Sequence, residues 1–271
     1  MKFMESTTRW RALIALGMMA VMMQTAGCSE VEISGKNAAD VFKDPQTLAL
    51  VNAACDADIP KIDALVKQGA NVNATGYRDM SVLGWTMACH SHRGAERLLE
   101  LGANPNQKMS GTADDSPMWL AAGSSDPKWL PMMLAHGGDP NIKAAAGGFE
   151  LALSAAIEQD RMQNVKLLLE HGADVNEHYA GNDTAAMDAA ALAKFDVVEM
   201  LLRHGYNYNL QDLANMVSVD HVPPNDPKHA AWLRVLKILA AKGFHPNVVP
   251  HIGGPPPGLV PSSSSGGGGY P

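Results

Sequence analysis

The chain has 271 residues, of which 46% are hydrophobic and 18% charged, with a formal net charge of −7 and three cysteines. This length provides a full hydrophobic core for one or two domains, so folding does not require a disulfide scaffold. The acidic charge argues against a nucleic acid as the main partner, because that polyanion is bound by a basic stripe. No apolar run reaches the roughly 18 residues that a membrane-spanning helix requires.

The N-terminus has the features of a targeting segment. Lys2, Arg9 and Arg11 form a basic start, and residues 12–23 form an apolar stretch that is too short to span a bilayer. The alternative is a short buried core helix. Removal of this segment takes away those three basic groups and Glu5, so the formal charge changes from −7 to −9.

Ala26-Gly27-Cys28 follows the apolar stretch and resembles the lipobox of bacterial lipoproteins, with Thr25 at the position where that box usually has Leu. The resemblance implies that residues 1–27 are a signal peptide and that Cys28 is lipidated after cleavage. Ser29, directly after the cysteine, implies the outer membrane rather than the inner one. We therefore expect a periplasm-facing protein that touches the membrane only through its lipid.

One pentapeptide recurs along the rest of the chain, with glycines 33, 35, 35, 33 and 38 residues apart. An apolar pair such as Leu98-Leu99 lies four and three residues before each glycine, except that Leu239-Ala240 precedes the last. A fixed period of this length predicts stacked repeats. The six pentapeptides begin at Gly69, Gly102, Gly137, Gly172, Gly205 and Gly243.

These positions, with the Ser or Thr at Ser81, Ser116 and Thr184, resemble the ankyrin-repeat pattern T-P-L-H-x-A-A followed by L-L-x-x-G-A-D-x-N. The resemblance implies an all-α ankyrin-repeat solenoid of about six stacked helix-turn-helix units with β-hairpin fingers. It covers residues 40–250. Residues 28–39 are then the lipidated cysteine and a tether, and residues 251–271 are a disordered tail rich in Pro, Ser and Gly.

The local chemistry agrees with this pattern. Ser116 is a helix-capping residue, and Pro117 suits the first helical turn, where its missing N–H does no harm. Each pentapeptide glycine is expected to end a helix in the left-handed conformation. His136, His171 and His204 each precede such a glycine, where they can bond the last carbonyls of the helix.

Sequence motifs for catalysis or cofactor binding are missing, so we expect no enzyme activity, no cofactor and no metal. The only suggestive cluster is Cys89-His90-Ser91-His92, and a metal there would need further ligands. The alternative is an ordinary turn between two helices.

Cys55 and Cys89 lie at equivalent positions of adjacent repeats, which makes them a candidate disulfide in an oxidising periplasm. Stacked repeats place equivalent backbones about 10 Å apart, however, whereas a disulfide needs Cα atoms within about 7 Å. The alternative is two small core residues.

The expected partner-binding surface lies on the fingers and the first helices. Residues 107–115 and 142–150 are two residues longer than residues 74–80 and 177–183, so the central fingers should form a raised ridge. Aromatic and Arg side chains among carboxylates are typical of binding hot spots. Two tryptophans either contact the partner or fill the core, namely Trp85 and Trp119. The other candidate contacts are Tyr77, Arg78, Met80, Asp114, Asp115, Phe149, Glu150, Glu158, Tyr179 and Asp183.

A repeat protein without a pocket motif is expected to be a noncatalytic recognition surface for another protein, here one with a basic rim. A lipoprotein with ankyrin repeats resembles the periplasmic immunity proteins that neutralise phospholipase toxins of type VI secretion. The alternative is a periplasmic ankyrin partner or scaffold that supports an endogenous enzyme such as a catalase.

Overall fold

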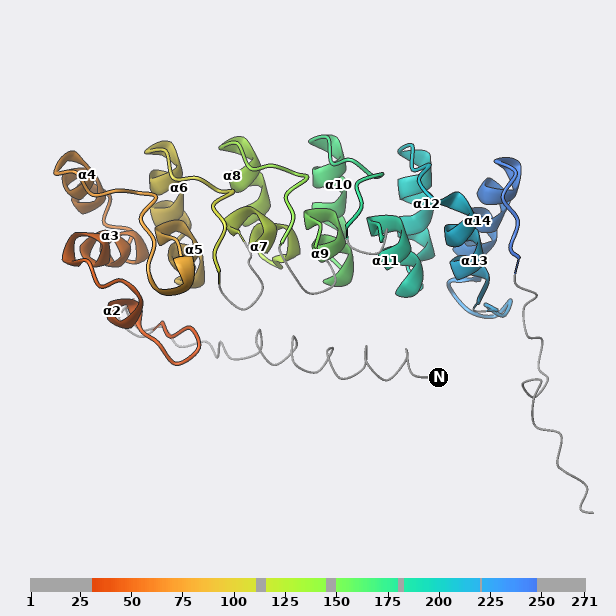
Figure 1. Cartoon of the computed structure of the whole chain (residues 1–271), viewed down its shortest axis with the longest axis horizontal. Coiled ribbons are helices and arrows are strands. Elements are labelled where there is room, and N and C mark those ends of the chain that lie inside the picture. The colour runs from red at the N-terminus through yellow and green to blue at the C-terminus, as the bar shows by residue number, and fades with distance from the viewer. Residues whose placement is uncertain (1–30, 111–115, 145–149, 180–182, 220, 248–271) are drawn as a thin grey trace, which may run out of the picture. The chain divides into compact units, whose positions relative to one another are not determined.

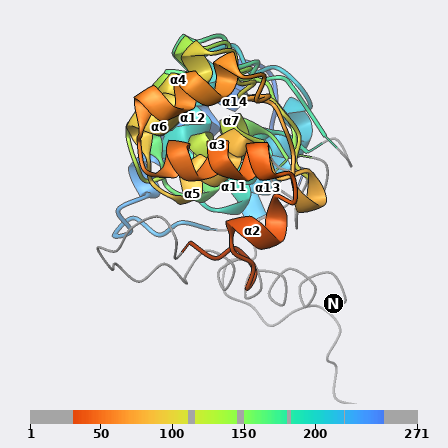
Figure 2. The ribbon, with the colours of Figure 1, turned by 90° about the vertical axis from the view of Figure 1, so that its left-hand side faces the viewer.

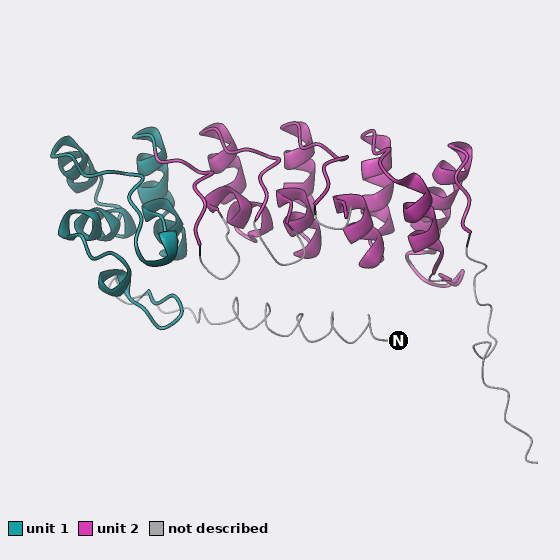
Figure 3. Ribbon diagram, in the orientation of Figure 1, with its two compact units in different colours: residues 1–102 teal, residues 103–271 magenta. Residues whose placement is uncertain are grey.

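The computed structural model describes residues 31–110, 116–144, 150–179, 183–219 and 221–247. The chain divides into two compact units, residues 1–102 and residues 103–271, which we call the N-terminal and C-terminal units (Figure 3). No helix in the described ranges combines the length and apolar character needed to cross a membrane.

The N-terminal unit contains two helix pairs and a short preceding helix. The first helix of each pair packs against the second, and α3 also packs against α5 and α6. The preceding helix, α2, lies on the side of α3 opposite to α4 (Figures 1 and 2). The elements are α2 (Ala38–Val41), α3 (Pro45–Cys55), α4 (Ile59–Lys67), η2 (Tyr77–Asp79), α5 (Val82–Ala88) and α6 (His92–Glu100).

The C-terminal unit contains four helix pairs. The first helices of these pairs pack on one another in chain order, and each pair is closed by its own second helix. The predicted helix-turn-helix units are thus confirmed, with six pairs among the described residues of the two units. The elements are α7 (Pro117–Gly123), α8 (Trp129–Ala135), α9 (Ala152–Glu158), α10 (Met162–Glu170), α11 (Ala185–Ala191), α12 (Phe195–Arg203), α13 (Leu210–Val219) and α14 (His229–Ala241).

The helices begin and end at the residues that the sequence indicated. The Ser116 hydroxyl accepts a hydrogen bond from the Trp119 N–H at 3.1 Å, with Pro117 in the first turn. All six pentapeptide glycines have positive φ, between +85° and +98°, a conformation that a Cβ disfavours. The imidazoles of His171 and His204 bond helix carbonyls four residues back, at 2.9 and 2.8 Å.

Successive pentapeptides are also linked within each unit by side-chain hydrogen bonds that we call the asparagine ladder. The third residue accepts a hydrogen bond from the N–H of the final Asn at 2.9 Å, which closes an Asx turn. The amide of that final Asn donates to the carbonyl of the next pentapeptide glycine, over 2.8–3.4 Å. The ladder pairs are Asn73–Gly102, Asn106–Gly137, Asn141–Gly172 and Asn176–Gly205.

The expectation of β-hairpin fingers needs correction for the described residues. Each of three fingers is closed by a single isolated antiparallel bridge instead of paired strands. In the first finger, Tyr77–Asp79 turns as a 3-10 helix, in which Arg78 has a φ of +55°. Only a few backbone hydrogen bonds flank each bridge in the described part of the fingers, such as Gly76 N–H to the Met80 carbonyl and Ala144 N–H to the Glu150 carbonyl. The three bridges are Thr75–Ser81, Lys143–Leu151 and His178–Thr184.

Candidate partner-binding site

In the N-terminal unit, the first finger presents an exposed aromatic side chain flanked by cations. Tyr77 is 50% exposed, and its ring centroid lies 4.9 Å from Lys36 Nζ and 5.5 Å from the Arg78 guanidinium carbon. Arg78 is exposed and Met80 is half-buried. These three predicted contacts are therefore near the surface of one finger, and their character is basic and aromatic.

Of the two alternatives for Trp85, partner contact and core filling, the structure agrees with core filling. Its side chain is 0% exposed and belongs to the core of the N-terminal unit. Phe42, just after α2, packs edge-on against the indole with ring centroids 5.8 Å apart. The helix that starts at Ala38 lies before the first repeat pattern, so the sequence did not reveal that it would help to cover this tryptophan.

Several predicted site residues lie outside the described residues. They include the lipidation candidate and three residues of the two longer fingers. These residues are Cys28, Asp114, Asp115 and Phe149.

The remaining predicted contacts come together in the C-terminal unit, around a residue that the sequence analysis missed. Tyr179 donates its phenolic O–H to Asp188 Oδ1 at 2.7 Å. Asp183 and Glu158 are close enough to act on the Asp188 carboxyl, and Glu150 acts on Tyr179. We call these five residues the acidic cluster: Glu150, Glu158, Tyr179, Asp183 and Asp188.

Trp119 lies beside this cluster. Its indole N–H donates to the backbone carbonyl of Glu150 at 3.1 Å, which links α7 to the end of the next finger. The side chain is half-buried, as are those of Glu150, Glu158 and Tyr179, while Asp183 is exposed. Trp119 therefore both fills space between elements and reaches the surface near the carboxylates.

Burial dominates the electrostatics of Asp188. Only 9% of this residue is exposed, and desolvation raises the pKa of its carboxyl to about 7. Ser154 and Tyr179 favour the ionised form through their hydroxyl groups, whereas the charges of Asp183 and Glu158 oppose it. Burial likewise raises the pKa of Asp183, and burial with the Asp188 charge raises the pKa of Tyr179.

Two polar atoms at the centre of the cluster have no hydrogen-bond partner among the described residues. They are Asp188 Oδ2 and the hydroxyl oxygen of Ser154, which is 0% exposed. No ion pair of the described residues includes Asp188. Both atoms are shielded from solvent, and the Ser154 hydroxyl lies close enough to the Asp188 carboxyl to favour its ionised form. The two residues therefore form the buried base of the acidic cluster.

Local sequence explains how this carboxylate is buried. Thr184 caps α11 through a 3.3 Å bond from the Met187 N–H, and α11 is otherwise mostly alanine. The small side chains allow α11 to pack against α9, which places Asp188 opposite Ser154. The sequence contains one feature that could have pointed to Asp188 as a site residue: it is the only charged residue in the run from Ala185 to Ala191.

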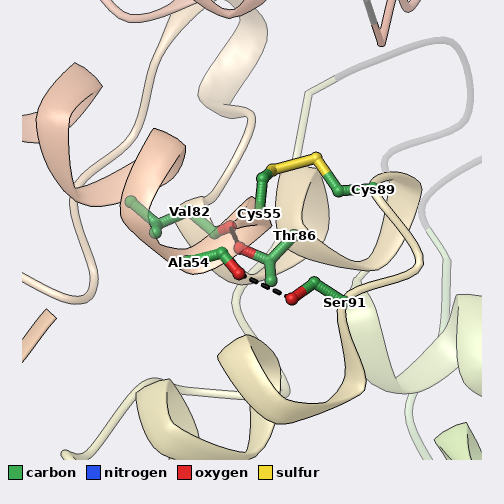
Figure 4. The surroundings of a disulfide bond; sticks show 6 residues. All are labelled: Ala54, Cys55, Val82, Thr86, Cys89 and Ser91. Carbon is green, nitrogen blue, oxygen red and sulfur yellow. Dashed lines mark hydrogen bonds between the residues drawn. A yellow bond between two sulfur atoms is a disulfide. The ribbon is translucent and has the colours of Figure 1, made fainter. Parts of the chain in front are cut away.

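Cys55 and Cys89 form a disulfide, with Cα atoms 5.4 Å apart (Figure 4). The expected separation of about 10 Å does not apply to these two residues: Cys55 is the last residue of α3, Cys89 is the C-cap of α5, and their Cα atoms lie within the range that a disulfide needs. Next to the bridge, the Ser91 hydroxyl donates to the Ala54 carbonyl at 2.6 Å. Both interactions tie the first helix pair of the N-terminal unit to the second.

The cluster from Cys89 to His92 is a turn between α5 and α6. His90 is exposed with a φ of +55°, and Ser91 is the N-cap position of α6. The Cys89 sulfur is bonded to that of Cys55 in the disulfide. No group of three or more His, Cys, Asp or Glu side chains in the described residues is arranged to hold a metal ion.

Comparison with known proteins agrees with this architecture. Residues 117–212 match the family model for ankyrin repeats in three copies. The structure is similar to the crystal structure of an ankyrin repeat domain from Acinetobacter baumannii, with a TM-score of 0.57 and 27% sequence identity. That match covers 72% of this chain and 97% of the other chain. No curated protein matches the sequence.

Ankyrin repeats are protein–protein interaction modules and generally act as nonenzymatic scaffolds. The acidic cluster and the exposed finger residues are accordingly candidate contacts for another protein. The chain is therefore an all-α protein with the ankyrin-repeat fold, and its residues 117–212 carry three recognisable copies of that repeat.

Proposed function

We propose that this chain is a noncatalytic, protein-binding lipoprotein of the bacterial cell envelope, and that it is an immunity protein that neutralises a periplasm-acting phospholipase toxin. The observation that carries the binding role is the gathering of Glu150, Glu158, Tyr179 and Asp183 around the buried Asp188. Such a surface complements a partner with a basic rim, and Trp119 beside it offers an aromatic anchor.

Two features support the proposed localisation in the cell envelope. The segment from Lys2 to Cys28 has the charge, apolar length and cysteine of a lipoprotein signal. The Cys55–Cys89 disulfide suits an oxidising compartment such as the periplasm, because disulfides are rare where thiols are kept reduced. A diacyl anchor would hold the repeats at the membrane surface, where a phospholipase works, since each buried methylene contributes about 0.8 kcal/mol.

Metabolic labelling tests whether the chain is a lipoprotein. Cells that express the chain should incorporate labelled palmitate into it, and Cys28→Ala should abolish the label. The matched control is Cys55→Ala, which removes a cysteine outside the expected lipobox and should leave the labelling intact. Unlabelled protein released with the soluble periplasmic fraction would overturn the lipoprotein assignment.

Inhibition of a purified enzyme tests the immunity role. The first step is to identify the genes adjacent to this one. A phospholipase found there should lose hydrolysis of phospholipid vesicles when an equimolar amount of the chain is added. Association should slow as salt increases, because exposed charges steer the encounter. Full hydrolysis with the chain in tenfold excess would exclude the immunity role. A neighbouring catalase whose activity rises on addition of the chain would support the scaffold instead.

A further inference from the structure

The stretch that follows the expected lipidation site has a defined conformation in the N-terminal unit. Ile33 and Lys36 exchange two backbone hydrogen bonds, at 3.0 and 3.1 Å, across a turn whose two central residues both have positive φ. Helix α2 follows directly and begins with a capping box formed by Asn37 and Asp40. Because α2 packs against α3, the chain is joined to the first helix pair from this turn onward.

The first finger lies against the end of α2. A Cβ at Gly76 would be 2.6 Å from the Val41 carbonyl oxygen and 2.9 Å from the Phe42 ring, so the finger backbone passes directly over these two buried residues. At the tip of the finger, the Tyr77 ring lies 4.9 Å from Lys36 Nζ in the turn before α2. The turn, α2 and the first finger therefore form one continuous surface.

The expected lipid is attached close to this surface. Cys28 comes three residues before Val31, where the described part of the chain begins. An extended chain spans at most about 3.6 Å per residue, so the lipid must be attached within about 11 Å of Val31. Two residues after Val31 the turn begins at Ile33, which is paired with Lys36. A membrane that holds the lipid is thus near the tip of the first finger.

The side chains at the tip are of types that are favoured in a lipid headgroup layer. Tyr77 is 50% exposed, and the Arg78 guanidinium and Lys36 ammonium groups both lie beside its ring. A tyrosine combines an apolar ring with a polar hydroxyl, while Lys and Arg extend their charges on long apolar stems. Both kinds of side chain are typical of the membrane–water interface, where the cations reach the headgroup phosphates.

Formal charge also distinguishes this surface from the rest of the acidic chain. Within residues 31–43 and 74–80, three cations balance three carboxylates, so an anionic membrane does not repel this part through a net negative charge. The six charged residues are Lys36, Lys43, Arg78, Glu32, Asp40 and Asp79.

Resting on the lipoprotein assignment proposed above, we propose that the first finger is a second membrane contact, with Tyr77 in the headgroup layer and Lys36 and Arg78 bound to lipid phosphates. The lipid alone attaches the chain at one point and leaves it free to rotate. A second contact fixes which side of the N-terminal unit faces the membrane. Helix α4 then faces away from the membrane, because it lies on the side of α3 opposite to α2 (Figures 1 and 2).

Amide hydrogen exchange measured by mass spectrometry tests this orientation. The chain is purified as cells produce it and studied in vesicles of equal parts phosphatidylethanolamine and phosphatidylglycerol, and separately in micelles of an uncharged, phosphate-free detergent. If the finger is docked about nine-tenths of the time, residues 77–79 should exchange about tenfold more slowly in the vesicles. The exposed turn after α4, residues 67–71, is the internal control and should exchange equally in both.

Variants separate the headgroup contact from the lipid anchor. Tyr77→Ala/Lys36→Gln should lose most of the slowing, and Arg78→Gln provides a second test at an exposed side chain. The matched control is Lys67→Gln, which removes an exposed cation at the end of α4 and should keep the slowing. Equal exchange of residues 77–79 in vesicles and micelles would overturn the proposal and leave Tyr77 as a candidate contact for a protein. Slowing that both finger variants retain would also overturn it.

Palmitate labelling of the same preparation distinguishes the two proposals. A labelled chain without slowed exchange would refute the headgroup contact and leave the lipoprotein assignment standing. An unlabelled chain whose finger exchanges more slowly when vesicles are added would support the headgroup contact and refute the lipoprotein assignment.

Discussion

The side-chain amide of Asn106 donates to the backbone carbonyl of Gly137, 31 residues further along the chain, at 2.8 Å. Its Oδ1 also accepts from the Asp139 N–H at 2.8 Å, so one side chain satisfies two backbone groups of the following repeat. We expect Asn106→Ala to lower the free energy of unfolding by about 1 to 3 kcal/mol, because both bonds are lost.

Urea unfolding followed by circular dichroism measures this change. The matched control is Asn207→Ala, since the side chain of Asn207 forms no hydrogen bond among the described residues. The control should unfold within about 0.5 kcal/mol of the wild type. Equal stability of the two variants would contradict a structural role for the ladder.

The disulfide should contribute substantially to the stability of the N-terminal unit. It closes a loop between residues 34 apart, for which chain-entropy arguments give about 3 to 4 kcal/mol. Reducing agent should therefore lower the unfolding midpoint of the wild type, whereas the double variant Cys55→Ser/Cys89→Ser should already be destabilised and should not respond further. A wild-type midpoint that is insensitive to reduction would count against the bridge.

Gly94 allows α6 to approach α3 closely. A Cβ at this position would overlap the Ala54 carbonyl oxygen, which already accepts the Ser91 hydroxyl. Gly94→Ala should therefore destabilise the chain by about 1 to 3 kcal/mol, despite the higher helix propensity of alanine. Gly123→Ala in α7 is the matched control, because the nearest atom lies 3.6 Å from its added Cβ. A thermal melt in which Gly94→Ala is as stable as this control would disprove the close contact.

The buried Asp188 should make stability depend on pH. Its pKa is raised from 3.8 to about 7, so between these values the folded chain holds a proton that the unfolded chain has released. The free energy of unfolding of the wild type should consequently fall as pH rises from about 4 to 7. The free energy of unfolding of Asp188→Asn should therefore increase relative to that of the wild type, by on the order of 4 kcal/mol over that range.

Unfolding free energies of the wild type and Asp188→Asn at several pH values test this, since the other titrating groups cancel in the difference. Tyr179→Phe removes a hydroxyl that favours the ionised carboxylate, so it should move the transition to higher pH. A difference between wild type and Asp188→Asn that stays constant from pH 4 to 8 would rule out a protonated Asp188 in the folded state.

The features predicted well from the sequence are those that recur at a fixed spacing and act locally. Ser116 caps the helix that follows it, and His171 bonds a carbonyl one turn away, so each is determined by a few neighbouring residues. The disulfide was harder to predict, because an average distance between repeats does not give the distance between two particular residues at helix ends, here 5.4 Å between Cα atoms. The positions of Trp85 and Asp188 depend on packing by other elements, namely residue Phe42 and helix α9.

The asparagine ladder separates the atoms that align the repeats from the atoms available for recognition. Its bonds come from the pentapeptides, which precede the fingers, so the register of one repeat on the next does not depend on finger length. Residues 107–115 and 142–150 are longer than residues 74–80, yet Asn73, Asn106 and Asn141 make the same bond. Insertions and substitutions in the fingers can therefore diversify binding specificity during evolution while the architecture is maintained.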